Sequence, residues 1–258
     1  NAGTDHMTML ERIGIDRLLG KSESDSNGRD EEVYPIVRLL ETAGLASVFE
    51  ATTWKEDTRI KGFGNEREQL NRFLERIESG TSVWDVGANL GLYTVFAARR
   101  GGVVHAFEPD PSFADRLRRN VDLNGQDATV HELALSDENR TTTLATDGLE
   151  GNSPALSADG DTERGRVTIE TSRGDALVSD IPDPEVLKID VEGAETDVLR
   201  GLGPRLSEAR AVMIELHPNM IERFGSDVEE ARSILEGEGF ETAWEPRRDD
   251  QIHVLSER

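Results

Sequence analysis

The pattern of apolar and polar positions predicts alternating strands and helices from about residue 81 onward. Short apolar, β-rich runs predict core strands at 83–86, 103–107, 129–133, 186–190 and 211–216. Apolar residues at helical spacing predict intervening helices at 90–99, 112–123, 194–202 and 228–236, before closing strands at 240–244 and 252–255. Strands that alternate with helices indicate right-handed βαβ crossovers, so we expect an α/β fold around a parallel sheet.

Two regions depart from this alternation. Before residue 80 the pattern predicts a helical elaboration, with helices at 10–19, 31–43 and 64–79, a strand at 47–53 and a polar linker at 21–30. Residues 1–6 are expected to be a cloning remnant ahead of Met7. Later, strands at 141–145 and 166–171 flank the segment 147–165, which is rich in Gly, Ser and Asp. A loop of that length is usually functional or disordered.

A glycine turn joins the first core strand to its helix, in the order Asp85-x-Gly87-x-x-x-Gly91. Glycine tolerates positive φ and lets a ligand approach the backbone closely, and the free amides at a helix start attract an anion. The next strand ends on Glu108, which lies 21 residues after Gly87. That spacing is typical of the acid that binds ribose hydroxyls in βαβ nucleotide folds. An adenosine-containing ligand is therefore predicted.

The identity of this ligand depends on Asp85. Dinucleotide enzymes carry G-x-G-x-x-G, whereas here a carboxylate precedes the first glycine. Asp85 would repel a pyrophosphate but attract the ammonium of a methionine moiety, or water ordered around it. We therefore predict S-adenosylmethionine, with NAD as a distant alternative.

Four ionisable residues follow two later strands. Asp190 and Glu192 come after the strand at 186–190, and Glu215 and His217 lie at the end of the strand at 211–216. Ligands of open parallel sheets bind outside the carboxyl ends of the strands, so these groups are expected to face the methyl group of the cofactor. An alternative is that Asp190 and Glu192 only cap the following helix, because acids are favoured at helix starts.

Composition adds one strong constraint, a net charge of −23 from 52 acidic and 29 basic residues. This charge disfavours binding to nucleic acid or anionic membranes. Only four lysines occur, so arginine supplies nearly all the positive charge. Such a surface resembles that of extreme halophiles, and we expect a haloarchaeal or similar cytoplasm. No apolar run is long enough to span a bilayer, and no cysteine is present for thiolate chemistry.

Five sequence blocks together resemble the FkbM family of S-adenosylmethionine-dependent methyltransferases. Between residues 82 and 217 they read DVGANLGLYT, FEPDPSFADRLRRNVDLNG, ELALSD, VLKIDVEGAETDVLRGL and IELH. The resemblance implies a class I, Rossmann-like methyltransferase domain over 80–258. Its sheet would have seven mostly parallel strands with an antiparallel last strand and helices on both faces, and 7–79 would form the N-terminal helical extension. O-methylation is the implied reaction.

The resemblance also implies which residues bind the cofactor. Asp85, Gly87, Ala88, Asn89, Gly91 and Thr94 would form the methionine-binding turn, and Glu108 would bind the ribose. Leu133 and Ala134 would border the adenine, and Asp137 is a weaker candidate for its exocyclic amine. Gly151-Asn152-Ser153 resembles a family loop, although Pro154 replaces the usual second serine.

The catalytic groups depend on the acceptor. Methyl transfer from a sulfonium is an in-line displacement, so the protein mainly supplies alignment. For a hydroxyl acceptor, His217 is the first candidate for the general base and Asp190 the second, with Glu192 beside them. For a carboxylate acceptor no base is needed, and Lys188 or an arginine would orient the substrate. His217 before Pro218 could also be a structural strand-end histidine.

A metal site formed by Asp190, Glu215 and His217 is chemically possible, because carboxylates and imidazole suit magnesium or manganese. The three residues lack a diagnostic spacing, so no metal is expected. The predicted function is methyl transfer to a hydroxyl of a small molecule or glycan. The alternatives are methyl esterification of a uronic acid carboxylate on a glycan and a non-catalytic module that binds an adenosine ligand. No motif identifies the acceptor.

Overall fold

The computed structural model describes residues 22–24, 30–32, 34–150, 155–156, 165–178, 180–248 and 250–258. The helix expected at 10–19 lies outside these residues. So do Gly151–Ser153 and most of the loop at 147–165.

One large sheet forms the centre of the molecule. Its strands are ordered β14-β16-β13-β12-β5-β6-β7, and the short strand β15 pairs with β16. Their bounds are Ser82–Val86 (β5), Val103–Phe107 (β6), Thr129–His131 (β7), Val186–Ile189 (β12), Ala211–Leu216 (β13), Glu241–Trp244 (β14), Arg247–Arg248 (β15) and Gln251–Glu257 (β16). Strands β13, β12, β5, β6 and β7 run parallel, and β16 lies antiparallel to β13. The fold is therefore that of a class I methyltransferase, as predicted.

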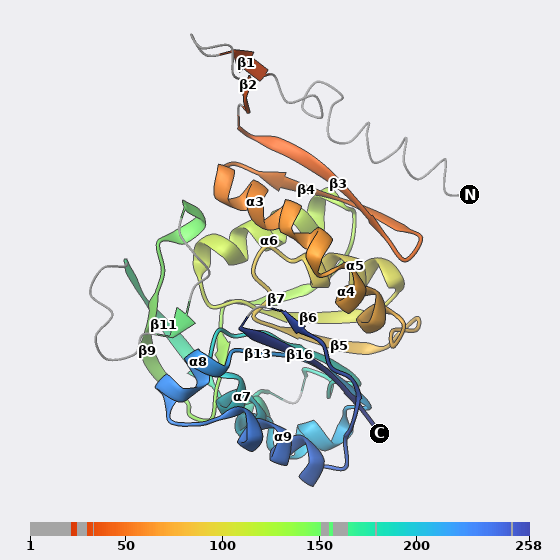
Figure 1. The fold of residues 1–258 in the computed structure, drawn as a ribbon, viewed down its shortest axis with the longest axis vertical. Coiled ribbons are helices and arrows are strands. Elements are labelled where there is room, and N and C mark those ends of the chain that lie inside the picture. Colours follow the sequence, from red (N-terminus) through yellow and green to blue (C-terminus); the bar gives the residue numbers. More distant parts are fainter. Residues whose placement is uncertain are drawn as a thin grey trace.

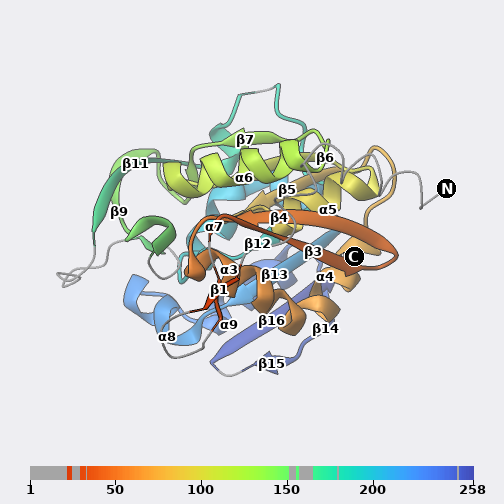
Figure 2. The same ribbon diagram turned by 90° about the horizontal axis from the view of Figure 1, so that it is seen from above.

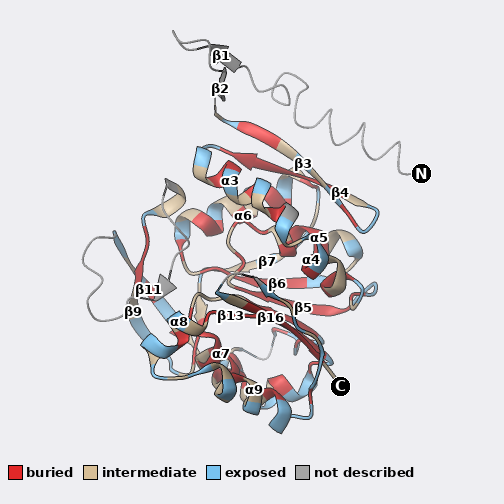
Figure 3. Cartoon of the chain, viewed as in Figure 1, coloured by how far each residue is buried: buried red, intermediate tan, exposed pale blue. Residues whose placement is uncertain are grey.

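Helices cover both faces of this sheet (Figure 1). On one face lie α4 (Arg67–Leu74), α5 (Leu92–Arg100) and α6 (Pro111–Leu123), and on the other α7 (Glu195–Leu202) and α9 (Val228–Gly237). Alternate residues of β5 point to opposite faces, so Val83 joins one core cluster while Trp84 and Val86 join the other. Figure 3 shows buried residues along the central strands and on the helix surfaces that face them.

The segment before the sheet differs from the prediction. The prediction of a helix at 31–43 was wrong. The chain there forms strand β3 (Ile36–Thr42), which pairs antiparallel with β4 (Leu45–Ala51). Thr42 lies opposite Leu45, so Ala43 and Gly44 form a two-residue turn, both with positive φ. That turn is typical of a tight hairpin. A further pair of short strands, β1 (Ser22–Ser24) and β2 (Asp30–Glu32), precedes it.

Two helices follow the hairpin, and the sequence predicted one of them. Helix α3 (Trp54–Gly62) was missed, although Thr53 and Glu56 form a capping box at its start. Helix α4 is shorter than the predicted 64–79. Figure 2 shows the hairpin lying across α5 and α6, and Phe49 of β4 packs against Phe96 of α5. The segment 34–79 is thus a hairpin with two helices, which corrects the expectation of a helical extension.

A smaller sheet stands beside the central one, with strands ordered β10-β9-β11-β8. Its strands are Ala134–Leu135 (β8), Arg140–Ala145 (β9), Ala155–Leu156 (β10) and Arg166–Ser172 (β11). The remaining elements are α8 (Pro218–Ile221) and the 3-10 turns Phe63–Asn65, Gly148–Glu150, Gly174–Ala176, Gly203–Glu208 and Glu222–Phe224. Among the described residues, no helix is both long and apolar enough to cross a membrane.

Candidate functional site

Two neighbouring cavities open at the carboxyl ends of the parallel strands. The apolar cavity measures about 650 Å³, its open mouth included, and its lining contains Glu108, Leu133, Ala134 and Leu144. The second, here called the acidic cavity, is lined by residues that include Arg59, Glu66, Tyr93, Lys188 and Glu215. Both cavities share four lining residues, Gly87, Asn89, Asp190 and Glu192. A ligand in the apolar cavity could therefore present a group to a second molecule in the acidic one.

The glycines of the turn are required by close packing. Gly87 has a φ of +76°, and a Cβ atom there would lie 1.8 Å from the carbonyl oxygen of Asp190. Gly91 has a φ of +83°, and its Cβ would meet Leu117 of α6 at 2.9 Å. From the sequence, glycine was expected at these positions because a ligand must approach the backbone closely. In the structure the neighbouring chain already occupies the space that a side chain would need.

Asp85 and Thr94 lie beneath the turn. Asp85 is fully buried, and its Oδ2 accepts a 2.6 Å hydrogen bond from the hydroxyl of Thr94, which is also fully buried. Neither residue lines the two cavities. Their geometry supports a role in fixing the turn, rather than the direct contact with methionine that the sequence suggested for Asp85.

Lys188 connects Asp85 to the cavities. Its Nζ donates a 2.8 Å hydrogen bond to the carbonyl oxygen of Gly87 and lies 3.4 Å from Asp85 and 3.6 Å from Asp190. Burial lowers the pKa of Lys188, but the charges of Asp85, Asp190 and Glu215 outweigh burial and raise it above the ordinary value. The ammonium therefore stays charged and holds the turn against β12.

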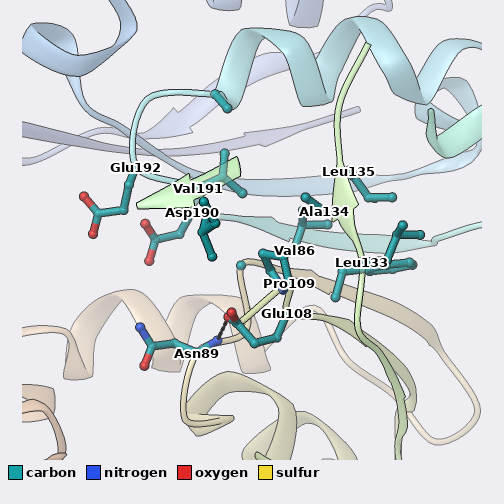
Figure 4. Close-up of a pocket in the computed structure, with 14 residues that line it drawn as sticks. Val86, Asn89, Glu108, Pro109, Leu133, Ala134, Leu135, Asp190, Val191 and Glu192 are labelled. Atoms are coloured by element: carbon teal, nitrogen blue, oxygen red, sulfur yellow. Dashed lines mark hydrogen bonds between the residues drawn. The ribbon is translucent and has the colours of Figure 1, made fainter. Parts of the chain in front are cut away.

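Glu108 lies at the wall of the apolar cavity. Its Oε2 accepts a 2.8 Å bond from the Asn89 amide (Figure 4). Its Oε1 accepts a 2.9 Å bond from the Asp110 amide. Burial raises the pKa of Glu108 to about 7, although these two bonds oppose the shift. Each carboxylate oxygen keeps a lone pair beyond its backbone bond, so Glu108 can accept two further hydrogen bonds from a ligand diol.

The other side of this cavity is apolar. Figure 4 shows Leu133, Ala134 and Leu135 on a common wall, with the carboxylates of Asp190 and Glu192 at the opposite side. A flat aromatic base fits between such side chains. Asp137 does not line either cavity, and its carbonyl oxygen accepts a 3.0 Å bond from Arg173. The chain has already left the cavity at that point, so the structure does not bring Asp137 to the other predicted residues.

His217 lies at the centre of a group of carboxylates. Its Nδ1 is 2.7 Å from Oε1 of the fully buried Glu195. Its Nε2 faces Glu215 at 3.5 Å, Glu192 at 3.6 Å and Asp190 at 3.9 Å. The structure therefore brings together the residues that the sequence placed at two strand ends.

The protonation state of His217 disfavours its predicted role as the general base. Burial lowers the pKa of His217, but its bonds to Glu195 and Glu215 and the charge of Asp190 outweigh burial and raise the pKa to about 11. An imidazole that already holds its proton cannot accept one from a substrate. The arrangement therefore argues against His217 as the general base.

The capping alternative for Asp190 and Glu192 also lacks support. Helix α7 begins after Ala194 without a side-chain cap, and the Gly193 amide donates to Oε1 of Glu195 instead. Glu192 has a φ of +54°, an uncommon conformation for a residue other than glycine. Such strained backbone is concentrated at functional sites.

Sequence reasoning missed several residues of the acidic cavity. Tyr93 is 5% exposed, and its hydroxyl has no hydrogen-bond partner among the described residues. Arg59 comes from α3, and Gln251 lies 3.2 Å from Nε2 of His217. Tyr93 belongs to the DVGANLGLYT block, so its closeness to the turn in sequence could have identified it as a residue of the site. The strand β16 gave no such signal for Gln251.

Known methyltransferases are similar to this chain in sequence. Hexuronic acid methyltransferase AglP of Haloferax volcanii is 29% identical over 222 residues, covering 85% of this chain and 88% of that protein. The 31-O-demethyl-FK506 methyltransferase FkbM of Streptomyces tacrolimicus is 30% identical and covers 80% of this chain and 89% of its own length.

Magnesium protoporphyrin IX methyltransferase of Synechocystis, crystallised with bound S-adenosylmethionine, supports the fold. It has a TM-score of 0.50 at 13% identity and covers 81% of this chain and 85% of its own. The sequence model of the FkbM methyltransferase domain matches residues 85–242. This range contains the glycine turn, Glu108 and the carboxylates around His217. The chain therefore belongs to the FkbM methyltransferase domain family and is an S-adenosylmethionine-dependent methyltransferase.

Proposed function

We propose that the apolar cavity binds the adenosine of S-adenosylmethionine and that the acidic cavity binds the methyl acceptor. Glu108 would accept hydrogen bonds from the ribose hydroxyls, while Leu133 and Ala134 would contact the adenine. The residues that both cavities share include Asp190 and Glu192. The sulfonium would lie beside these carboxylates, where the acceptor oxygen can align with the methyl group for in-line attack.

We propose a sugar hydroxyl as the acceptor, and the acidic lining of the second cavity carries this proposal. Glu66, Asp190, Glu192 and Glu215 all line it. Carboxylate oxygens accept hydrogen bonds, and the adjacent hydroxyls of a sugar are the complementary donors.

A second candidate is the carboxylate of a hexuronic acid, favoured by the resemblance to AglP of Haloferax volcanii. Arg59 also lines the acidic cavity, and arginine binds carboxylates through two parallel hydrogen bonds. Under the hydroxyl proposal Arg59 would hold a carboxylate elsewhere on the sugar. Under the second candidate the carboxylate itself would receive the methyl group.

Transfer from cofactor with an isotopically labelled methyl group tests these acceptors. The acceptors would be a neutral hexoside, a hexuronoside with a free carboxylate and the same hexuronoside as its methyl ester. A sugar hydroxyl gives a methyl ether that survives mild alkali, and the methyl-esterified hexuronoside remains a substrate. A label lost in mild alkali would support the ester and overturn the hydroxyl proposal. Cofactor binding without transfer to any of these glycans would overturn the sugar acceptor.

The residues before the sheet would act as a cap over the acceptor. Arg59, Gly62 and Glu66 come from α3 and the turn that follows it, and all three line the acidic cavity. The proposed catalytic domain, 80–258, supplies the cofactor side. We expect differences in acceptor choice between relatives to arise in this cap segment.

The setting that we propose is the cytoplasm of a salt-loving cell of haloarchaeal type. The net charge of −23 supports it, and so does the resemblance to a Haloferax volcanii protein. Dense carboxylates repel one another in dilute buffer, and molar salt screens that repulsion.

A further inference from the structure

Three side chains at the junction of the two cavities have the geometry of a cation site. One ligand atom from each of Asp190, Glu192 and His217 lies within 4.8 Å of the others. The two carboxylates follow β12 and the imidazole follows β13, so adjacent parallel strands hold the three groups in place. Side chains fixed by a rigid sheet edge suit a binding centre.

The orientation of His217 fits metal ligation. Its Nδ1 is bonded to the fully buried Glu195, and its Nε2 points to Asp190 and Glu192 at 3.9 and 3.6 Å. Ligating histidines usually donate their second ring N–H to a carboxylate. Glu195 would be this orienting partner. The cation would displace the proton and the Gln251 contact at Nε2, so its binding would release a proton.

An independent observation points to a ligand in the same space. Tyr93 lines the acidic cavity together with Asp190 and Glu192, is only 5% exposed, and has no hydrogen-bond partner for its hydroxyl among the described residues. Burial raises the pKa of this hydroxyl, and the charges of Glu66, Glu215, Asp190 and Asp85 raise it further. A buried hydroxyl without a partner is costly, so a bound oxygen that pairs with Tyr93 would relieve that cost.

We propose that Asp190, Glu192 and His217 bind a divalent cation of the Mg²⁺ or Mn²⁺ type, which in turn binds the acceptor oxygen. This replaces the expectation of no metal, and Glu192 takes the place that the sequence gave to Glu215. Two carboxylates and one imidazole suit these ions and leave coordination positions open for substrate. The role for the cation rests on the proposed transfer to a sugar hydroxyl.

The cation would make the hydroxyl a better nucleophile, because a bound O–H loses its proton more readily. In the step, the acceptor oxygen forms a bond to the methyl carbon as the carbon–sulfur bond breaks. The electron pair of that bond stays on sulfur and gives S-adenosylhomocysteine. The hydroxyl proton passes to a cavity carboxylate and then to water. No redox partner is needed.

Calorimetry of the full chain, first treated with chelator and then titrated with Mn²⁺ alone, tests the site. The wild type is expected to bind one ion per chain. Asp190→Asn, Glu192→Gln and His217→Asn should each weaken Mn²⁺ binding at least about tenfold, because loss of even a residue that only orients a ligand commonly costs that much. Glu66→Gln is the matched control, because it removes a carboxylate from the same cavity outside the proposed ligand set and should leave Mn²⁺ binding unchanged.

Thermal melting of each variant verifies folding, so a variant that fails to fold is set aside and the other two decide. No Mn²⁺ binding by the wild type, or equal binding by all ligand variants and the wild type, would overturn the site. These results require no acceptor, so they are separate from the proposed function. Methyl transfer to a sugar at full rate in chelator would refute the cation while leaving the sugar proposal intact.

Discussion

Glu108 couples the proposed cofactor site to pH. Its pKa is raised to about 7 by burial, and its ionised form is the better acceptor for ribose hydroxyls. At pH 6 about a tenth of a group with this pKa is ionised, whereas at pH 8 about nine tenths is. The affinity for S-adenosylmethionine should therefore rise about tenfold between pH 6 and pH 8, and binding should release protons.

Calorimetry in buffers of different ionisation enthalpy measures both effects. Glu108→Gln keeps the size of the side chain but cannot titrate, so its weaker binding should lose the pH dependence. An equal slope of affinity against pH in wild type and Glu108→Gln would assign the effect to another group.

Gly87 is the residue where added bulk should cost most. Its Cβ would lie 1.8 Å from the Asp190 carbonyl oxygen, whereas Gly80, with a similar φ of +89°, has open space. Both alanine variants carry the strain of positive φ, so their difference isolates the clash. Gly87→Ala should lower the free energy of unfolding by about 1–3 kcal/mol more than Gly80→Ala. Denaturant titration measures this, and equal losses would contradict the packing argument.

Part of the candidate site could be predicted residue by residue. Glu108, Asp190 and His217 were found because strands of a parallel sheet deliver their carboxyl ends to one edge. The strand-end rule does not say which way a side chain points, so Asp85 was expected to face a ligand although it is fully buried. Glu195 orients His217 from inside a helix, and only the three-dimensional contact identifies it.

At the scale of elements, the hairpin β3 to β4 shows where sequence patterns mislead. Ile36, Val37, Leu39 and Leu40 allow a helical pattern, and the turn at Ala43 and Gly44 is short. Pairing with β4 decides the outcome, because seven residues of each strand pair in register. Such strand pairing overrides the local helical propensity. The parallel strands were predictable since most of them are short runs rich in apolar residues.

Arg116 joins helix α6 to the hairpin and to helix α3. From α6 it reaches Glu50 of β4 and the fully buried Glu56 of α3, each at 2.7 Å. Without Arg116 the buried Glu56 has no charged partner among the described residues, although Arg119 still reaches Glu50 at 3.2 Å. Arg116→Ala should therefore lower the free energy of unfolding by about 3 kcal/mol.

Arg118 on the same helix is the matched control. It is 39% exposed and pairs with Asp115 and Glu132 at the surface, so Arg118→Ala should cost less than about 1 kcal/mol. Chemical denaturation compares the two variants. Similar losses would mean that the buried pair does not join the hairpin to helix α6.

The whole molecule carries a charge of −23, which leads to a prediction about salt. Screening should reduce the repulsion among surface carboxylates, so the melting temperature should rise by several degrees between dilute buffer and molar KCl. Differential scanning calorimetry across a KCl series measures this change. A melting temperature that gains nothing from salt would count against a halophilic origin.

The overall architecture was predictable because its alternation of strand and helix follows from a parallel sheet covered on both faces. The methyl acceptor could not be predicted, because Arg59 and Glu66 of the acidic cavity come from α3 and the turn after it, a segment without a recognisable motif. The proposed cofactor site depends on local turns and strand ends, whereas the proposed acceptor site depends on how distant segments meet.

The placement of the cofactor is the central claim, and calorimetry with S-adenosylmethionine on three proteins tests it most directly. Wild type should bind one molecule per chain. Glu108→Ala should bind it at least about tenfold more weakly, because two charge-assisted hydrogen bonds to ribose are lost. Asp137→Ala should match wild type, since Asp137 lies outside both cavities. Unchanged affinity in Glu108→Ala, or equal weakening in both variants, would contradict the account.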